Sequence, residues 1–180
     1  GRRIAIVLST YPGKAYQMAH AVGLDALAST DAILEDLAVA GYALGEGPRE
    51  KPESALATKR MTWPLAAYQA ALARLPGDVR DDLERSWGAP DSDPACVDGA
   101  FAFAAVEHGG VLVALQPERG RRDVRSEEYH DLSRCPRHAY AAFYLWLQAR
   151  GTDALVHVGA HGTLEWLPGK AVALSGACWP

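Results

Sequence analysis

The chain has 180 residues, of which 49% are hydrophobic and 22% charged, a balance typical of globular domains. No apolar run approaches the roughly 18 residues that a membrane-spanning helix requires, so we expect no membrane span and a cytoplasmic location. The formal net charge of -4 gives no broad attraction to phosphate backbones, which argues against nucleic acid as a partner.

The cysteines and the start of the chain suggest an intracellular piece of a larger protein. Cys96, Cys135 and Cys178 are odd in number and far apart, so they form neither a CxxC metal knuckle nor a disulfide framework, and we expect reduced, structural thiols. The chain starts at Gly1 directly before a strand-like run, with no signal peptide. We therefore expect an internal fragment of a longer polypeptide.

The first part of the chain predicts a strand, a loop and a helix. Ile4–Leu8 is a short apolar run of β-forming residues, followed by turn residues. Residues 15–22 are compatible with a helix, and residues 29–31 (Ser-Thr-Asp) are expected to cap a second helix that ends at Gly41. Such units build parallel α/β sheets, whose ligands lie beyond the carboxyl ends of the strands, so the loop from Ser9 to Lys14 is well placed for function.

A polar connection and two helices are predicted next. Residues 45–61 are polar and interrupted by Pro48 and Pro52, which favours an exposed linker. Helices are predicted at 64–75 and 79–87, because a Pro-Gly-Asp sequence between them supplies a stop and a cap.

The rest of the chain predicts a hairpin, a helix and a strand. Residues 99–107 and 111–116 are strand-like and are joined by His-Gly-Gly, a hairpin turn that makes the sheet mixed. A helix at 138–150 and a strand at 154–158 follow. The sequence thus predicts an α/β fold, a mixed, largely parallel sheet flanked by helices in Rossmann-like layers, within a larger multidomain chain. Its expected parts are a first unit (1–48), a linker (49–62) and the remainder of the same α/β body (63–180).

The string ALVHVGAHGTLEWLPGK carries His157, His161 and Glu165 at a spacing of four. Gly159 and Gly162 disfavour a helix, so we expect the string to start on a strand and to leave its carboxyl end as a loop. Two imidazoles and a carboxylate can hold a divalent metal such as Co, Ni, Cu or Zn, or move protons near neutral pH. A strand histidine is as often a hydrogen-bonded core residue, so both interpretations of His157 stay open.

Two familiar signatures are absent. The zincin pattern H-E-x-x-H fails because Val158 stands where its glutamate would be. A nucleotide P-loop fails because Ala171, rather than Ser or Thr, follows Gly169-Lys170. If ATP is consumed, we expect another polypeptide to bind it.

Two segments carry a family resemblance. The first is IAIVLSTYPGKAYQMAHAVGLDALAS and the second is EYHDLSRCPRHAYAAFYLWLQARGTDALVHVGAHGTLEWLPGKAVALSGACWP. Together they closely resemble the large subunits of aerobic cobaltochelatases of the CobN type, a family similar to the H subunits of magnesium chelatase. The most specific block is HGTLEWLPGK, in which magnesium subunits carry Phe-Met in place of Trp166-Leu167. Residues 13–20 depart from the Asn- and Gly-rich version common in magnesium subunits.

The resemblance implies a reaction and its partners. It implies a ligase-type activity in cobalamin biosynthesis. In this reaction Co2+, the substrate metal, is inserted into the corrinoid tetrapyrrole hydrogenobyrinic acid a,c-diamide in an ATP-dependent step. The large subunit binds the macrocycle, while AAA+ ATPase partner subunits use ATP and Mg2+, which this segment is not expected to bind. We expect the isolated fragment to be inactive.

The chemistry of insertion suggests roles for individual residues. The ion must lose water and the macrocycle its pyrrole protons, so a base and a transient ligand are needed beside a flat slot. We expect Glu165 to be the base or metal-delivery carboxylate, with His161 and His157 as a transient metal ligand and its support. We expect the glycines to admit the edge of the macrocycle and Arg119 to pair with carboxylates of the substrate. The expected substrate contacts are His157, Gly162, Trp166, Gly169, Lys170, Tyr11 and Arg119.

Three alternatives remain at this stage. The chain could belong to the magnesium branch, with protoporphyrin as substrate. It could be a docking module of the complex without substrate contact, with His161 and Glu165 bonded internally. It could also be an independent zinc-type hydrolase, which predicts stoichiometric metal in the isolated chain.

Overall fold

The computed structural model describes residues 1–9, 20–21, 24–120, 134–159, 167–169 and 178–179, and it shows a mixed α/β fold. The chain divides into two compact units. Unit 1 comprises Gly1–Met61, Phe103–Gln116 and Leu147–Gly162, and unit 2 comprises Thr62–Ala102, Pro117–Trp146 and Thr163–Pro180. The chain passes between the two units several times, and the three ranges expected from composition stay a prediction.

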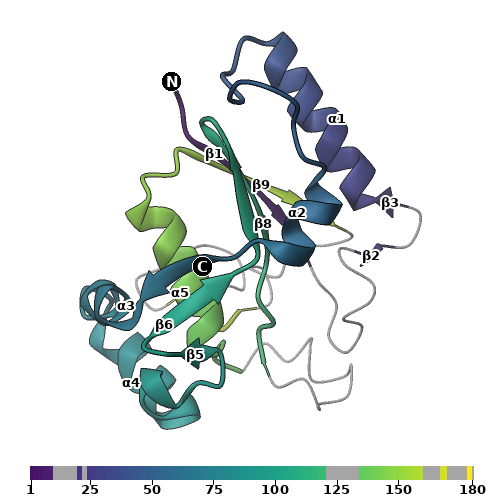
Figure 1. The fold of residues 1–180 in the computed structure, drawn as a ribbon. Coiled ribbons are helices and arrows are strands. Elements are labelled where there is room, and N and C mark those ends of the chain that lie inside the picture. Colours follow the sequence, from purple (N-terminus) through teal and green to yellow (C-terminus); the bar gives the residue numbers. More distant parts are fainter. Residues whose placement is uncertain (10–19, 22–23, 121–133, 160–166, 170–177, 180) are drawn as a thin grey trace. The chain divides into compact units, whose positions relative to one another are not determined.

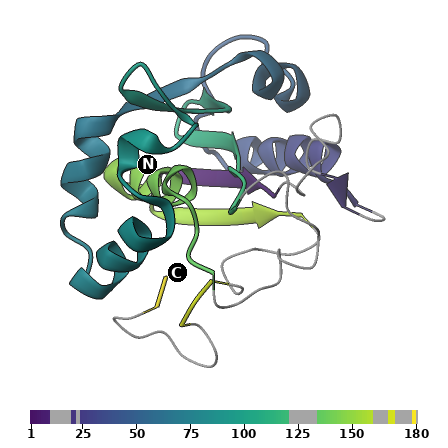
Figure 2. The same cartoon turned by 90° about the horizontal axis from the view of Figure 1, so that it is seen from below.

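Unit 1 is built on a four-stranded sheet of order β7-β8-β1-β9 (Figure 1). The inner strand β1 (Ile4–Leu8) pairs in parallel with β8 (Val111–Leu115) and with β9 (Ala154–Val158). Figure 2 shows β1 and β9 side by side with the same direction. At the other edge β7 (Ala105–His108) pairs antiparallel with β8. The predicted mixed, largely parallel sheet is confirmed.

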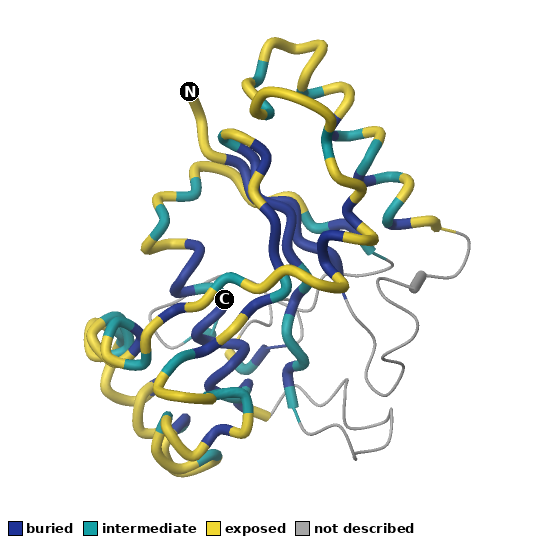
Figure 3. Tube along the Cα trace, viewed as in Figure 1, coloured by how far each residue is buried: buried dark blue, intermediate teal, exposed yellow. Residues whose placement is uncertain are grey.

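Strand β1 is the most buried element of unit 1 (Figure 3). All five of its residues are buried, as the continuous apolar run of an inner parallel strand predicts. Successive side chains alternate between the faces, and Ile4, Ile6 and Leu8 pack into a hydrophobic core. Ala5 and Val7 lie on the opposite face and are equally inaccessible.

Two helices of unit 1 cover the Ile4–Leu8 core. The helix α1 (Ala26–Val39) contributes Leu34, and α2 (Pro52–Thr58) contributes Leu56, which are fully or almost fully buried. α2 lies within the segment that was predicted to be an exposed linker. Pro52, at the first position of α2, favours the start of a helix, and the apolar side of that helix is buried.

The start of α1 differs from the prediction. The helix is capped by Asp25, whose Oδ1 accepts a hydrogen bond of 2.9 Å from Ala28 N, four residues before the expected Ser-Thr-Asp cap. Thr30 is an interior helix residue, and its hydroxyl donates to Ala26 O at 2.7 Å. The predicted cap at 29–31 was therefore wrong, although the helix ends close to Gly41 as expected.

The stretch 15–22 also differs in its described part. His20–Ala21 is a short strand, β2, which pairs antiparallel with β3 (Leu24–Asp25), where a helix-compatible stretch was expected. Residues 15–19 and 22 lie outside the described residues.

The hairpin between β7 and β8 is confirmed, and its turn requires glycine. Gly109 has a φ of +57°, and a Cβ added there would collide with the carbonyl oxygen of Ala43. The neighbouring Gly110 N donates to the same oxygen at 3.1 Å. The turn is thereby fixed against the chain that follows α1.

Unit 2 combines helices with a three-stranded sheet of order β4-β6-β5. The strands are β4 (Met61–Pro64), β5 (Cys96–Val97) and β6 (Ala100–Phe103); β6 was predicted as one continuous strand with β7. The helices are α3 (Leu65–Leu72), α4 (Gly77–Trp87), the 3-10 turn η1 (Pro90–Ser92) and α5 (His138–Ala149), whose last turn counts with unit 1. The predicted helices at 64–75, 79–87 and 138–150 are confirmed.

A buried histidine in unit 1 makes stability depend on pH. His108 is 7% exposed, and its Nε2 has no hydrogen-bond partner among the described residues. Burial lowers the pKa of His108 below its ordinary 6.5; Arg49 and Lys59 lower the pKa further, and Asp31 and Glu50 oppose them. The folded state therefore favours the uncharged imidazole.

We predict that the chain loses stability on acidification from about pH 7.5 to about pH 5.5, because unfolded His108 gains a proton that the folded state resists. His108→Gln should lose less stability over the same interval, as measured by urea unfolding at the two pH values. Equal losses in the two proteins would show that His108 does not set this dependence.

Candidate functional site

The predicted motif begins on β9 in unit 1. His157 is half-buried, and its register partner on β1 is Val7. The strand ends at Val158, directly before the segment GAHGTLEW. The expectation that the motif starts on a strand is confirmed, whereas the predicted loop at 160–166 lies outside the described residues.

Six residues of the predicted site lie outside the described residues, and their roles stay predictions. They are Tyr11, His161, Gly162, Glu165, Trp166 and Lys170. Within the described residues, no group of three or more His, Cys, Asp or Glu side chains is arranged to hold a metal ion. The proposed transient metal ligands therefore stay a prediction.

Three strand ends meet at the carboxyl edge of the parallel sheet. Ser9 follows β1, Gln116 follows β8 and Gly159 follows β9; we call these three residues the carboxyl-edge row. Ser9 N donates to the carbonyl oxygen of Val158 at 3.1 Å, and Gln116 N donates to that of Leu8 at 2.9 Å. The row thus continues the parallel pairing for one more residue, at the edge where ligands of α/β proteins bind.

His157 and two members of the carboxyl-edge row share one face of the sheet. Leu8 and Val158 point into the core under α1 and α2, so Val7, Ser9, His157 and Gly159 lie on the opposite face. His157 is thus a diagonal neighbour of Ser9 across the β1–β9 pair. His157 and Ser9 therefore lie on the same face of the sheet.

Ser9 and Gly159 are in close contact. A Cβ added at Gly159 would lie 2.8 Å from Ser9 Cβ and 3.0 Å from Ser9 Oγ, so any larger residue would collide with Ser9. Ser9 is 8% exposed, and its Oγ has no hydrogen-bond partner among the described residues. Sequence reasoning placed Ser9 in a functional loop but did not single it out; the signal was a hydroxyl directly after a buried strand.

The other two described residues of the predicted site belong to unit 2. Arg119 is 5% exposed; its Nη2 donates to Arg134 O at 3.3 Å, and its carbonyl oxygen accepts from Arg137 N at 2.9 Å. Gly169 is exposed with a φ of +84° in a turn, and its carbonyl oxygen accepts a hydrogen bond from the Cys178 thiol. Their contacts with substrate stay predictions.

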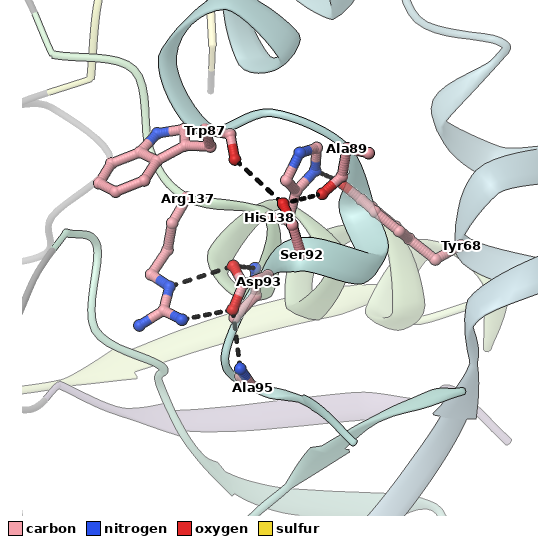
Figure 4. A network of polar contacts seen from close by, with 9 residues as sticks. Tyr68, Trp87, Ala89, Ser92, Asp93, Ala95, Arg137 and His138 are labelled. Atoms are coloured by element: carbon pink, nitrogen blue, oxygen red, sulfur yellow. Dashed lines mark hydrogen bonds and ion pairs between the residues drawn. The ribbon is translucent and has the colours of Figure 1, made fainter. Parts of the chain in front are cut away.

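Unit 2 also contains a buried polar network (Figure 4). The Asp93 carboxylate accepts hydrogen bonds from the Arg137 guanidinium, from Ala95 N at 2.9 Å and from Ala139 N at 3.1 Å. Burial alone would raise the pKa of Asp93, but the bonds from Arg137 and the two amides outweigh it and hold this pKa below its usual range. Asp93 therefore stays ionised and joins η1 to the start of α5.

A second part of the network centres on His138, which is 1% exposed. Its Nε2 lies 2.9 Å from the carbonyl oxygen of Gly88, so Nε2 donates, and Nδ1 accepts from the Tyr68 hydroxyl at 2.7 Å. Burial raises the pKa of Tyr68 above its ordinary 10, and burial likewise raises the pKa of the Cys135 thiol. These groups pair with each other and with backbone, which indicates a structural role.

Comparison with known proteins places the whole chain in one family. The sequence profile described as CobN/Magnesium Chelatase matches residues 1–180. The aerobic cobaltochelatase subunit CobN of a Sinorhizobium species is 40% identical, over 99% of this chain and 15% of that protein. The H subunit of the magnesium chelatase of Chlorobaculum parvum is 29% identical, over 99% of this chain and 15% of that protein.

A solved structure agrees with the sequence match. The catalytic subunit of cobaltochelatase from Mycobacterium tuberculosis superposes with a TM-score of 0.77 and 31% sequence identity, over 98% of this chain and 16% of that chain. The chain thus spans 15 to 16% of the length of these relatives. No helix in the described part of the chain is long and apolar enough to cross a membrane.

We predict that Gly159→Ala destabilises the chain by about 1–3 kcal/mol, because the added methyl group overlaps the Ser9 side chain. Ser9→Gly removes that side chain, so the double variant should recover most of the loss. Urea unfolding of the two single variants and the double variant measures this coupling. Simple additivity of the two substitutions would contradict the contact.

Proposed function

Because the chain belongs to the CobN/magnesium chelatase family, we propose that it forms part of the tetrapyrrole-binding large subunit of an ATP-dependent metal chelatase. The family match over residues 1–180 is the observation that carries this proposal. The start of the HGTLEWLPGK motif beyond β9 supports it, because the carboxyl edge of a parallel sheet is where α/β proteins bind ligands.

For the substrates, we propose Co2+ and hydrogenobyrinic acid a,c-diamide, in cytoplasmic cobalamin biosynthesis. The 40% identity to a cobaltochelatase subunit, against 29% to a magnesium-chelatase subunit, favours the cobalt branch. Trp166-Leu167, at the position where magnesium subunits carry Phe-Met, supports the same choice. Magnesium insertion into protoporphyrin is the second candidate.

The sequence holds no P-loop, which supports a division of labour between subunits. In this proposal AAA+ partner subunits bind ATP with Mg2+ and hydrolyse it, and the present segment contributes to the site that holds the macrocycle. A docking module without substrate contact is the competing role for this segment.

Metal insertion needs a proton acceptor and a transient ligand near the macrocycle. Glu165 is the proposed acceptor of the pyrrole protons or the carboxylate that delivers the ion. His161 is the proposed transient ligand of the incoming ion. His157 supports it from β9, where its half-buried position and its pairing across from Val7 hold the start of the motif. Arg119 is proposed to pair with substrate carboxylates, and Tyr11, Gly162, Trp166, Gly169 and Lys170 complete the proposed contacts.

We predict that Glu165→Gln and His161→Ala in the complete large subunit retain macrocycle binding and slow cobalt insertion by about 100-fold or more, since a positioned acid-base group contributes about 10²–10⁴-fold. Binding is measured by absorbance, and insertion in the presence of the ATPase partners. Glu84→Gln, at an exposed position of α4, is the matched control and should behave as the wild type.

The two readouts separate the alternatives. Lost binding would assign Glu165 and His161 to the macrocycle cradle rather than to the chemical step. Unchanged binding and insertion would make the motif structural and favour the docking module.

We predict that the complete subunit with its partners inserts Co2+ into hydrogenobyrinic acid a,c-diamide at least about tenfold faster than Mg2+ into protoporphyrin, a ratio that corresponds to about 1.4 kcal/mol. Each pair is assayed by the absorbance change of its metallated product under matched conditions. A preference for the magnesium pair would move the chain to the second candidate function.

A further inference from the structure

The Ser9 hydroxyl is a buried polar group that takes no part in the hydrogen bonding of the described fold. Its oxygen is inaccessible and lacks a hydrogen-bond partner among the described residues. An unpaired buried hydroxyl destabilises a protein relative to a paired one, so such groups are uncommon and call for an explanation. Thr30 in α1 shows the usual arrangement, since its fully buried hydroxyl donates to Ala26 O at 2.7 Å.

The surroundings of Ser9 indicate where its partner would lie. Gly159 has no side chain, and the Cβ that it lacks would stand 3.0 Å from Ser9 Oγ. The end of β9 thus packs tightly against Ser9 and offers its hydroxyl no side-chain partner, on the face of the sheet that also carries His157. Gly159 is partly exposed, so the contact between Gly159 and Ser9 lies near the surface at the carboxyl edge, where ligands of α/β proteins bind.

We propose that Ser9 is a substrate-binding residue, whose hydroxyl donates a hydrogen bond to a carboxylate or carboxamide oxygen at the edge of the bound tetrapyrrole. This inference rests on the proposed function. A serine hydroxyl can donate one hydrogen bond, and carbonyl-type oxygens are the acceptors on the side chains of corrinoid tetrapyrroles. The hydroxyl would be hydrogen-bonded only when substrate is bound. Binding would therefore remove the destabilisation that the unpaired hydroxyl causes in the free protein, and this gain adds to the affinity for the ligand.

The test compares Ser9→Ala with two other variants in the complete large subunit. Ser9→Cys keeps the approximate size of the side chain and replaces the hydroxyl by a weak donor, and it carries the test if Ser9→Ala does not fold. Thr30→Val is the matched control, because it removes a buried hydroxyl that is already paired within α1. Affinity is measured by titration with hydrogenobyrinic acid a,c-diamide, and folding by the melting temperature without ligand.

We expect Ser9→Ala and Ser9→Cys to weaken binding about tenfold, the change that about 1.4 kcal/mol produces, with an unchanged or higher melting temperature. Thr30→Val should show the opposite pattern, a lower melting temperature with unchanged affinity. This contrast separates a ligand contact from a structural hydroxyl.

Two results would overturn the proposal in distinguishable ways. Wild-type affinity in both Ser9 variants would remove Ser9 from the substrate site and leave the proposed function intact. Failure of the wild-type protein to bind the tetrapyrrole would overturn the proposed function, and the role of Ser9 with it.

Discussion

The parallel pairing of β1 with β8 and β9 is the constraint on which unit 1 and its candidate site depend. Three strands that run in the same direction end at the same edge, so Ser9, Gln116 and Gly159 become neighbours although they are far apart in the sequence. The burial of β1 on both faces holds this arrangement, because a shift by one residue would turn Ile4, Ile6 and Leu8 away from their core.

The two units use their buried polar groups differently. In unit 2 the carboxylate of Asp93 and the ring of His138 are paired with other side chains and with backbone, which joins helices and turns and leaves little capacity for a ligand. In unit 1 the hydroxyl of Ser9 lacks such a partner among the described residues, at a strand end. Paired groups stabilise a fold, whereas an unpaired one at a ligand-binding edge suggests a contact that forms only in the complex.

The differences between prediction and structure have local physical causes. Ser29, Thr30 and Asp31 have side chains suited to a helix cap, but Asp25 is the residue that bonds the free amide of the first turn. The segment around Pro52 is polar in composition, yet Ala55 and Leu56 lie on one side of a helix and become buried. For the cap, several residue types in the segment suit the same role, and for α2 only the packing of the unit decides which residues become buried.

The sequence alone determined the inner strands, the main helices, the hairpin and the family, because continuous apolar runs, Gly and Pro punctuation and the HGTLEWLPGK block are local patterns. It also indicated that the motif leaves the end of a strand. Only the tertiary structure decided which strand ends meet, that Ser9 lies against Gly159, and that Arg119 is buried and hydrogen-bonded. These facts depend on pairings between residues far apart in the chain or on the packing of a whole unit, and no local pattern specifies them.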